Sequence, residues 1–200
     1  MQKNFNKIAL TLSLTVLMGI SIGCGNQESK QTTAPPQGET QQSTPTPATT
    51  MDKQEIDRFN TYVPNIKGGS FIKQAEIKDN SATILFVKDY AELKSVKPEN
   101  KITEDDYKNY WSKGDAINKT LSIETVRLFK EFEGLSKINM VLPFQGKEYN
   151  LSVDRKAVEE FFNLDLTSLK QTDKWQNDFL AKYDNTEERA KFVQKFVQTK

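Results

Sequence analysis

Apolar and polar residues alternate in two pairs of segments, and each pair predicts a β-hairpin. In the clearer pair, apolar side chains recur at every second position over residues 138–144 and again over residues 149–153, with a turn between them at residues 145–147. The other pair comprises residues 70–78 and 81–89. Its second segment is almost continuously apolar, which is typical of a strand that is covered on both faces.

Apolar residues at helical spacing predict the remaining elements. A first helix extends from Asp52 to about Tyr62 and ends before Pro64, which cannot continue it. Thr103 and Asp106 resemble a capping box, in which each side chain binds the backbone N–H of the other residue, so they predict the start of a helix. The further predicted helices cover residues 103–113, 115–133, 154–162, 175–183 and 186–198.

The order of these elements predicts an α+β domain. The strands of a hairpin are antiparallel, so two hairpins with helices inserted between and after them favour an antiparallel four-stranded sheet with helices packed on it. Two segments are expected to be irregular: Asp89–Pro98, a surface loop, and Lys67–Ser70, a turn before the first strand. The glycines in that turn do not predict a phosphate-binding loop, because no strand precedes them and no helix follows them.

The first 24 residues have the pattern of a secretory signal. Lys3 and Lys7 precede an uncharged, largely apolar stretch of 15 residues from Ile8 to Ile22, which is followed by Gly23 and Cys24. A basic start, a short apolar segment and a small residue at its end are the parts of a signal peptide, and the apolar segment is short for a membrane span.

The four residues Ser21-Ile22-Gly23-Cys24 resemble the lipobox of bacterial lipoproteins, although Ser21 stands where leucine is commonest. The resemblance implies that residues 1–23 are removed as a signal peptide and that lipid on Cys24 anchors the protein at the extracytoplasmic face of the cell membrane, since two or more acyl chains give stable anchoring. In a cell with two membranes, Gly25 after the cysteine implies the outer membrane. The alternative is an ordinary secreted protein whose cysteine is unmodified.

Residues 24–50 are predicted to be the anchored cysteine and a disordered tether. Residues 25–50 are rich in Thr, Pro and Gln and contain no large apolar side chain, so they cannot bury enough surface to offset the entropy of ordering. Residues 51–200 are long enough for a single core and are expected to form one α+β domain. We identify no family for this domain from its motifs.

The folded segment is electrically neutral and lacks the residues of common catalytic sites. The chain has 28 Lys and Arg and 27 Asp and Glu, and 25 of each lie after residue 50. A neutral domain does not favour nucleic-acid binding, which needs a basic surface. There is no histidine, and Cys24 is the only cysteine, which excludes Ser-His-Asp and Cys-His catalysis and the common zinc sites. We therefore expect no cofactor and no metal.

Acidic pairs and aromatic residues are the remaining candidates. The acidic pairs lie in helical segments and are expected on solvated faces: Asp105/Asp106, Glu131/Glu133, Glu159/Glu160 and Glu187/Glu188. Tyr107, Tyr110 and Trp111 share one helix face and, with Trp175, form the candidate binding surface, because amphipathic rings suit interfaces. The alternative is that these rings belong to the core, since an amphipathic helix needs an apolar stripe merely to pack.

These observations predict a non-enzymatic, membrane-anchored lipoprotein whose domain binds a protein or an envelope component. One alternative is a carboxylate-based hydrolase of cell-wall glycan, which requires two carboxylates that converge in a cleft. Another is a lipoprotein that binds a small molecule, which requires a pocket with a few convergent polar groups.

Overall fold

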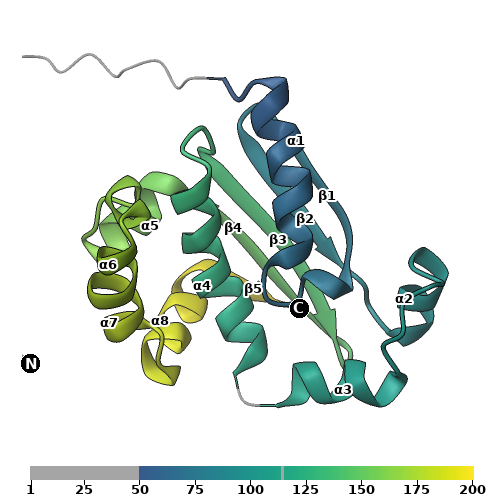
Figure 1. Ribbon diagram of the computed structural model, residues 1–200. Helices are drawn as coiled ribbons and strands as arrows, with labels where there is room; N and C mark the ends of the chain where they lie inside the picture. Colours follow the sequence, from purple (N-terminus) through teal and green to yellow (C-terminus); the bar gives the residue numbers. More distant parts are fainter. Residues whose placement is uncertain (1–49, 114) are drawn as a thin grey trace, which may run out of the picture. The chain divides into compact units, whose positions relative to one another are not determined.

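The structure is a computed structural model that describes residues 50–113 and 115–200 (Figure 1). These residues belong to one compact unit. The predicted signal peptide, Cys24 and the tether up to residue 49 lie outside the described residues, so lipidation and disorder of the tether remain predictions. Within the described part of the chain, no helix is long and apolar enough to cross a membrane.

In the described residues one sheet of five strands forms, and the strands are arranged in the sheet in the order of the chain. They are β1 (Ile72–Lys78), β2 (Ser81–Phe86), β3 (Lys137–Phe144), β4 (Lys147–Asp154) and β5 (Val197–Thr199). Both predicted hairpins are confirmed, because β1 pairs with β2, and β3 with β4, in antiparallel orientation. Their two-residue turns have positive φ angles at Asp79, Asn80, Gln145 and Gly146, as tight hairpin turns require.

The prediction of an antiparallel four-stranded sheet was wrong in two respects. The first is that β2 and β3 are parallel, with Ser81 beside Lys137. The helices between the hairpins carry the chain back to the start of β2, where the backbone N–H of Ser136 donates to the carbonyl oxygen of Asn80 at 2.9 Å. The second is the fifth strand: Val197 pairs with Leu151 at the open edge of β4.

Helices and helical turns form most of the remaining chain. The helices are α1 (Lys53–Tyr62), α2 (Tyr90–Val96), α3 (Glu104–Ser112), α4 (Ala116–Glu131), α5 (Arg155–Phe162), α6 (Thr172–Lys174), α7 (Ala181–Tyr183) and α8 (Thr186–Phe196). A π-helical turn (Trp175–Leu180) joins α6 to α7, and 3₁₀ turns lie at Val63–Asn65, Gly69–Phe71 and Thr167–Lys170. Because the last residues pair with β4, α8 ends at Phe196 and not at residue 198 as predicted.

Side-chain caps fix where several helices begin. The predicted capping box is confirmed, since Thr103 Oγ1 accepts a hydrogen bond from the Asp106 N–H at 3.1 Å and Asp106 Oδ2 accepts one from the Thr103 N–H at 3.0 Å. The expected surface loop at residues 89–98 contains α2 instead. Asp89 Oδ1 accepts a hydrogen bond from the N–H of Glu92 at 2.7 Å and so caps this short helix.

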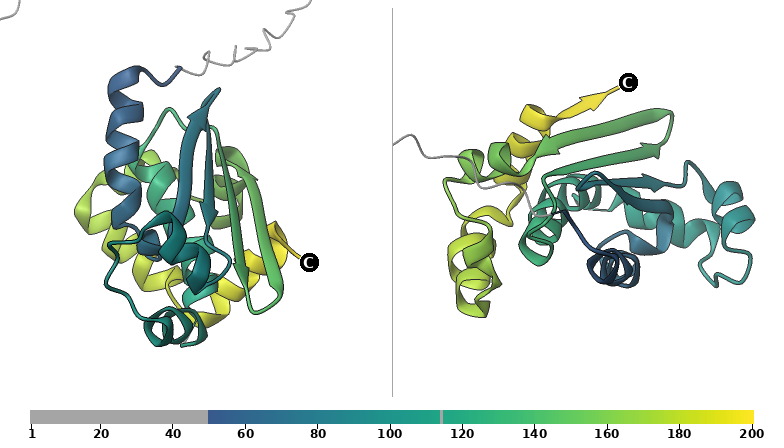
Figure 2. Two further views of the ribbon diagram at one scale, coloured as in Figure 1. Left: turned by 90° about the vertical axis from the view of Figure 1, so that its right-hand side faces the viewer. Right: turned by 90° about the horizontal axis from the view of Figure 1, so that it is seen from above.

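The long helices pack on one face of the sheet, with α4 against its middle (Figure 2). Every residue of α4 from Thr120 to Val126 is buried. In the described part of the chain no helix covers the other face, where Asn139 donates to Ser81 Oγ at 3.0 Å and accepts from Ser152 Oγ at 2.8 Å. The expectation that β2 is covered on both faces is therefore wrong: alternate residues of β2 stay partly exposed on this face.

Candidate functional site

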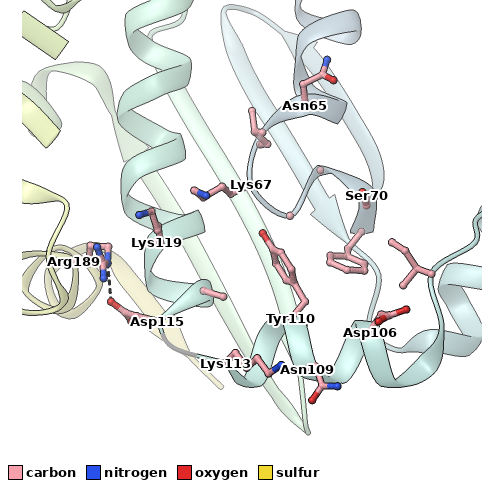
Figure 3. A pocket seen from close by; sticks show the side chains of 16 residues that line it. Asn65, Lys67, Ser70, Asp106, Asn109, Tyr110, Lys113, Asp115, Lys119 and Arg189 are labelled. Carbon is pink, nitrogen blue, oxygen red and sulfur yellow. Dashed lines mark hydrogen bonds and ion pairs between the residues drawn. The ribbon is translucent and has the colours of Figure 1, made fainter. Parts of the chain in front are cut away.

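A cleft of ≈ 840 Å³ lies where the loop before β1 meets the helices (Figure 3). Its wall is formed by residues 65–71, by α3, by the first turn of α4 and by Arg189 on α8. The loop reaches this position because β1 starts beside the end of β2, where Ile72 pairs with Phe86. The chain leaves β2 at the same end to form α2 and α3, so segments distant in sequence meet around one hollow.

Two glycines allow the loop to pack so closely. Gly68 has a φ angle of 78°, and a Cβ atom there would lie 2.7 Å from Cη2 of Trp111. A Cβ atom at Gly69 would lie 2.2 Å from the carbonyl oxygen of Pro64. The predicted turn at Lys67–Ser70 therefore exists, and its glycines serve close approach of the backbone to α3 and to the loop itself.

Four cations line the cleft, and two of them are tied in a partly buried ion-pair network. Arg189 Nε lies 2.8 Å from Asp115 Oδ2, and Arg189 Nη1 lies 2.5 Å from Asp184 Oδ1. The other carboxylate oxygen of Asp184 lies 2.6 Å from Lys119 Nζ. This network joins α8 to the start of α4 and largely neutralises both cations.

The other two cations, Lys67 and Lys113, are exposed and make no ion pair among the described residues. The two acids on the cleft wall are already engaged. Asp106 accepts hydrogen bonds from the backbone and hydroxyl of Thr103, which hold the pKa of its carboxyl below the usual value. Asp115 is bound by Arg189.

A buried carboxyl lies under the loop. Glu124 on α4 is 1% exposed, and Arg127 Nε donates to its Oε2 at 2.9 Å. Burial raises the pKa of Glu124, and Arg127 and the backbone N–H of Lys67, which face the carboxyl, oppose the rise. Burial likewise raises the pKa of the Tyr110 phenol, whose oxygen faces the N–H of Gly68. Both groups therefore lie against the backbone of the loop.

The structure buries three of the four aromatic residues of the predicted binding surface. Tyr107 is 3% exposed, Trp111 3% and Trp175 7%, so these three belong to the core and the predicted surface is not formed. Trp111 packs on Phe71, with ring centroids 5.4 Å apart. Only Tyr110 is partly exposed, and it lines the cleft.

The glycan-hydrolase alternative required two free carboxylates in a cleft. The predicted acidic pairs do not supply them: apart from Asp106 they lie away from the cleft, and most form ion pairs with lysines, among them Lys130, Lys156, Lys170 and Lys191. Nor do three or more potential acidic, cysteine or histidine metal ligands come together anywhere in the described part of the chain.

Sequence reasoning missed Lys67 as a residue of the cleft and Glu124 as the buried carboxyl beneath the loop. A signal for each was present, because Lys67 precedes two glycines and Glu124 is the one charged residue in the segment 120–126. Comparison with protein-family models, with curated proteins and with solved structures found no match to this chain. The candidate site is therefore identified from the structure alone.

Proposed function

We propose that this protein is a lipid-anchored extracytoplasmic lipoprotein whose domain, residues 51–200, is a non-enzymatic binding module, and that the cleft beside the loop 65–71 is its binding site. The observation that carries the proposal is the cleft itself. Its volume of ≈ 840 Å³ lies within the range of small-molecule sites, and its wall combines an aromatic ring with convergent polar and charged groups.

The shape and size of the cleft favour some classes of ligand over others. A concave site of this size suits a small molecule or a compact part of an envelope component better than a flat protein surface. Of the two alternatives, the small-molecule-binding lipoprotein therefore gains support. The glycan hydrolase does not, because Glu124 is enclosed and Asp106 and Asp115 are engaged by neighbours.

The anchor is tested by changing Cys24 to serine in cells that make the full chain. We expect the unchanged protein to sediment with membranes and to incorporate labelled palmitate, and the Cys24→Ser variant to do neither. Membrane association with labelling in the variant would contradict the assignment of Cys24.

The binding site is tested by fragment screening of the full chain, extracted in a mild detergent, with backbone NMR signals as the readout. Fragments that bind should shift signals of the loop 65–71 and of the start of α4. Asn109→Trp fills the cleft from an exposed position on its wall and should abolish these shifts, whereas Asn60→Trp, exposed on α1 outside the cleft, should preserve them. Shifts that cluster elsewhere, or that survive Asn109→Trp, would refute the assignment.

A further inference from the structure

We infer that the ligand of the cleft carries an anionic group, a carboxylate or a phosphate, and that the ammonium groups of Lys67 and Lys113 bind it while the Tyr110 ring contacts the rest of the molecule. The inference rests on the proposed function, since it names the ligand class of the same site. Some charges on the wall are already paired, and others are available to a ligand.

The cleft has more cations than free acids. Of its four cations, Lys119 and Arg189 share Asp184, and Arg189 also binds Asp115. The remaining acid on the wall, Asp106, is held at the start of α3 by Thr103. In Figure 3, Lys67 lies on the α4 side of Tyr110 and Asp106 on the opposite side. The local charge is therefore positive although residues 51–200 have equal numbers of acids and bases.

The buried carboxyl of Glu124, which interacts with Lys67, does not remove this charge. Glu124 lies beneath the loop at 1% exposure, and Arg127 already donates to it. Burial raises the pKa of this carboxyl, and its ion-pair partner Arg127 opposes that rise. The Lys67 ammonium is thus available to an anion arriving from solvent.

The backbone that carries Lys67 is rigid, which suits a preformed site. The N–H of Gly69 donates to the carbonyl of Ile66 at 2.9 Å, and the N–H of Phe71 donates to the carbonyl of Gly68 at 2.9 Å. Lys113 follows the last turn of α3, and its N–H donates to the carbonyl of Asn109 at 3.0 Å. Lys67 and Lys113 therefore line the same cleft as the Tyr110 ring, and charge-assisted hydrogen bonds from their ammonium groups would fix the orientation of an anion.

Three ring compounds of similar shape test the charge of the ligand: benzoate, phenyl phosphate and neutral benzamide. Each is titrated at constant ionic strength into the full chain in mild detergent, and Kd is obtained from the NMR signals of the loop 65–71. We expect at least one of the two anions to bind about tenfold more tightly than benzamide. A comparison of the two anions distinguishes a carboxylate-bearing from a phosphate-bearing ligand.

The lysines are tested by the double variant Lys67→Met/Lys113→Met, which keeps the side-chain length and removes the charges. Its anion Kd should rise about tenfold, to the value for benzamide. The control variant Lys78→Met/Lys147→Met changes two exposed lysines outside the cleft and should bind anions as the unchanged protein does. The NMR spectrum of each variant shows whether it is folded.

The outcomes separate the two proposals. If benzamide binds in the cleft as tightly as the anions, or if the Lys67/Lys113 variant binds anions normally, the anionic class is refuted while the cleft remains the binding site. If neither these compounds nor the fragments of the screen shift the signals of the cleft, the proposed function fails together with the inference.

Discussion

The loop that walls the cleft depends on Gly69, and the change Gly69→Ala should destabilise the domain for a purely steric reason. Gly69 has no positive φ angle, so alanine suits its backbone conformation. The added Cβ atom would nevertheless lie 2.2 Å from Pro64 O, 2.6 Å from Pro64 C and 3.0 Å from Val63 O. All three are backbone atoms of the preceding 3₁₀ turn, so no side chain can rotate to relieve the contact.

The magnitude follows from how far the loop must move. Carbon and oxygen atoms normally approach to about 3.3 Å, so the loop has to shift by about 1 Å. Overpacking of this kind costs about 1–3 kcal/mol, and a contact with fixed backbone belongs at the upper end. The lower entropy of the unfolded alanine chain offsets up to about 1 kcal/mol. We expect a net loss of about 2 kcal/mol in the free energy of unfolding.

Gly146 provides the matched control, because it has a positive φ angle but free space around it, whereas Gly69 has neither. The φ angle of Gly146 is 76°, but a Cβ atom there would meet nothing within 4 Å. Gly146→Ala should therefore lose only the conformational energy of a left-handed residue, about 1 kcal/mol. The assay is urea unfolding of the full chain in mild detergent, followed by tryptophan fluorescence. If Gly69→Ala is no more destabilising than Gly146→Ala, the steric reasoning about the loop is refuted.

Three further predictions concern the surroundings of the cleft and the core. Thr103→Ala removes the cap of α3 and should destabilise the protein by about 1 kcal/mol in the same urea assay, while Thr103→Ser should be nearly neutral; equal effects would contradict the cap. Arg155 donates to the carbonyls of Phe129, Phe132 and Leu135 at 2.7–2.8 Å. Arg155→Ala should therefore lower the stability by about 3 kcal/mol, with Arg155→Lys in between, because buried acceptors lose their donors; a loss below 1 kcal/mol would contradict this. Glu124 has a pKa that burial raises in the folded state, so its contribution to stability is complete below the pKa of the unfolded chain and is lost as the pH rises through the folded pKa. The stability of the unchanged protein relative to Glu124→Gln should consequently fall as the pH rises above the ordinary pKa of a glutamate, and a rise with pH there would refute the reasoning.

The elements that the sequence predicted well are those determined by neighbouring residues. The β3–β4 hairpin has strict alternation and a turn containing Gly146, and α3 begins at a capping box. Pairing between distant segments was not predictable in this way. The parallel pairing of β2 with β3 depends on the path of three helices, and β5 depends on an open edge of β4.

Whether the aromatic residues of the candidate site are exposed or buried could not be predicted from the sequence either. Tyr107, Tyr110 and Trp111 share one helix face, and their spacing cannot distinguish a ring that fills the core from one that lines a cleft. The distinction comes from the loop 65–71, which covers Trp111 through Gly68 and leaves Tyr110 at the edge. A candidate residue is therefore exposed or buried according to a segment some 40 positions earlier in the chain.

The position of the cleft follows from the feature of the sheet that the sequence did not predict. Because β2 and β3 are parallel, the segment between them must leave at one end of the sheet and return along α4 to the other. The departing segment provides α3 and Tyr110, and α4 begins with Asp115 and Lys119 at the same end. The loop with Lys67 also lies there, since β1 is antiparallel to β2 and starts where β2 ends. In open sheets, ligands bind outside the carboxyl ends of parallel strands, where connecting segments leave a crevice. An antiparallel sheet of two adjacent hairpins would have no such crossover, so the single parallel pair is what creates the cleft.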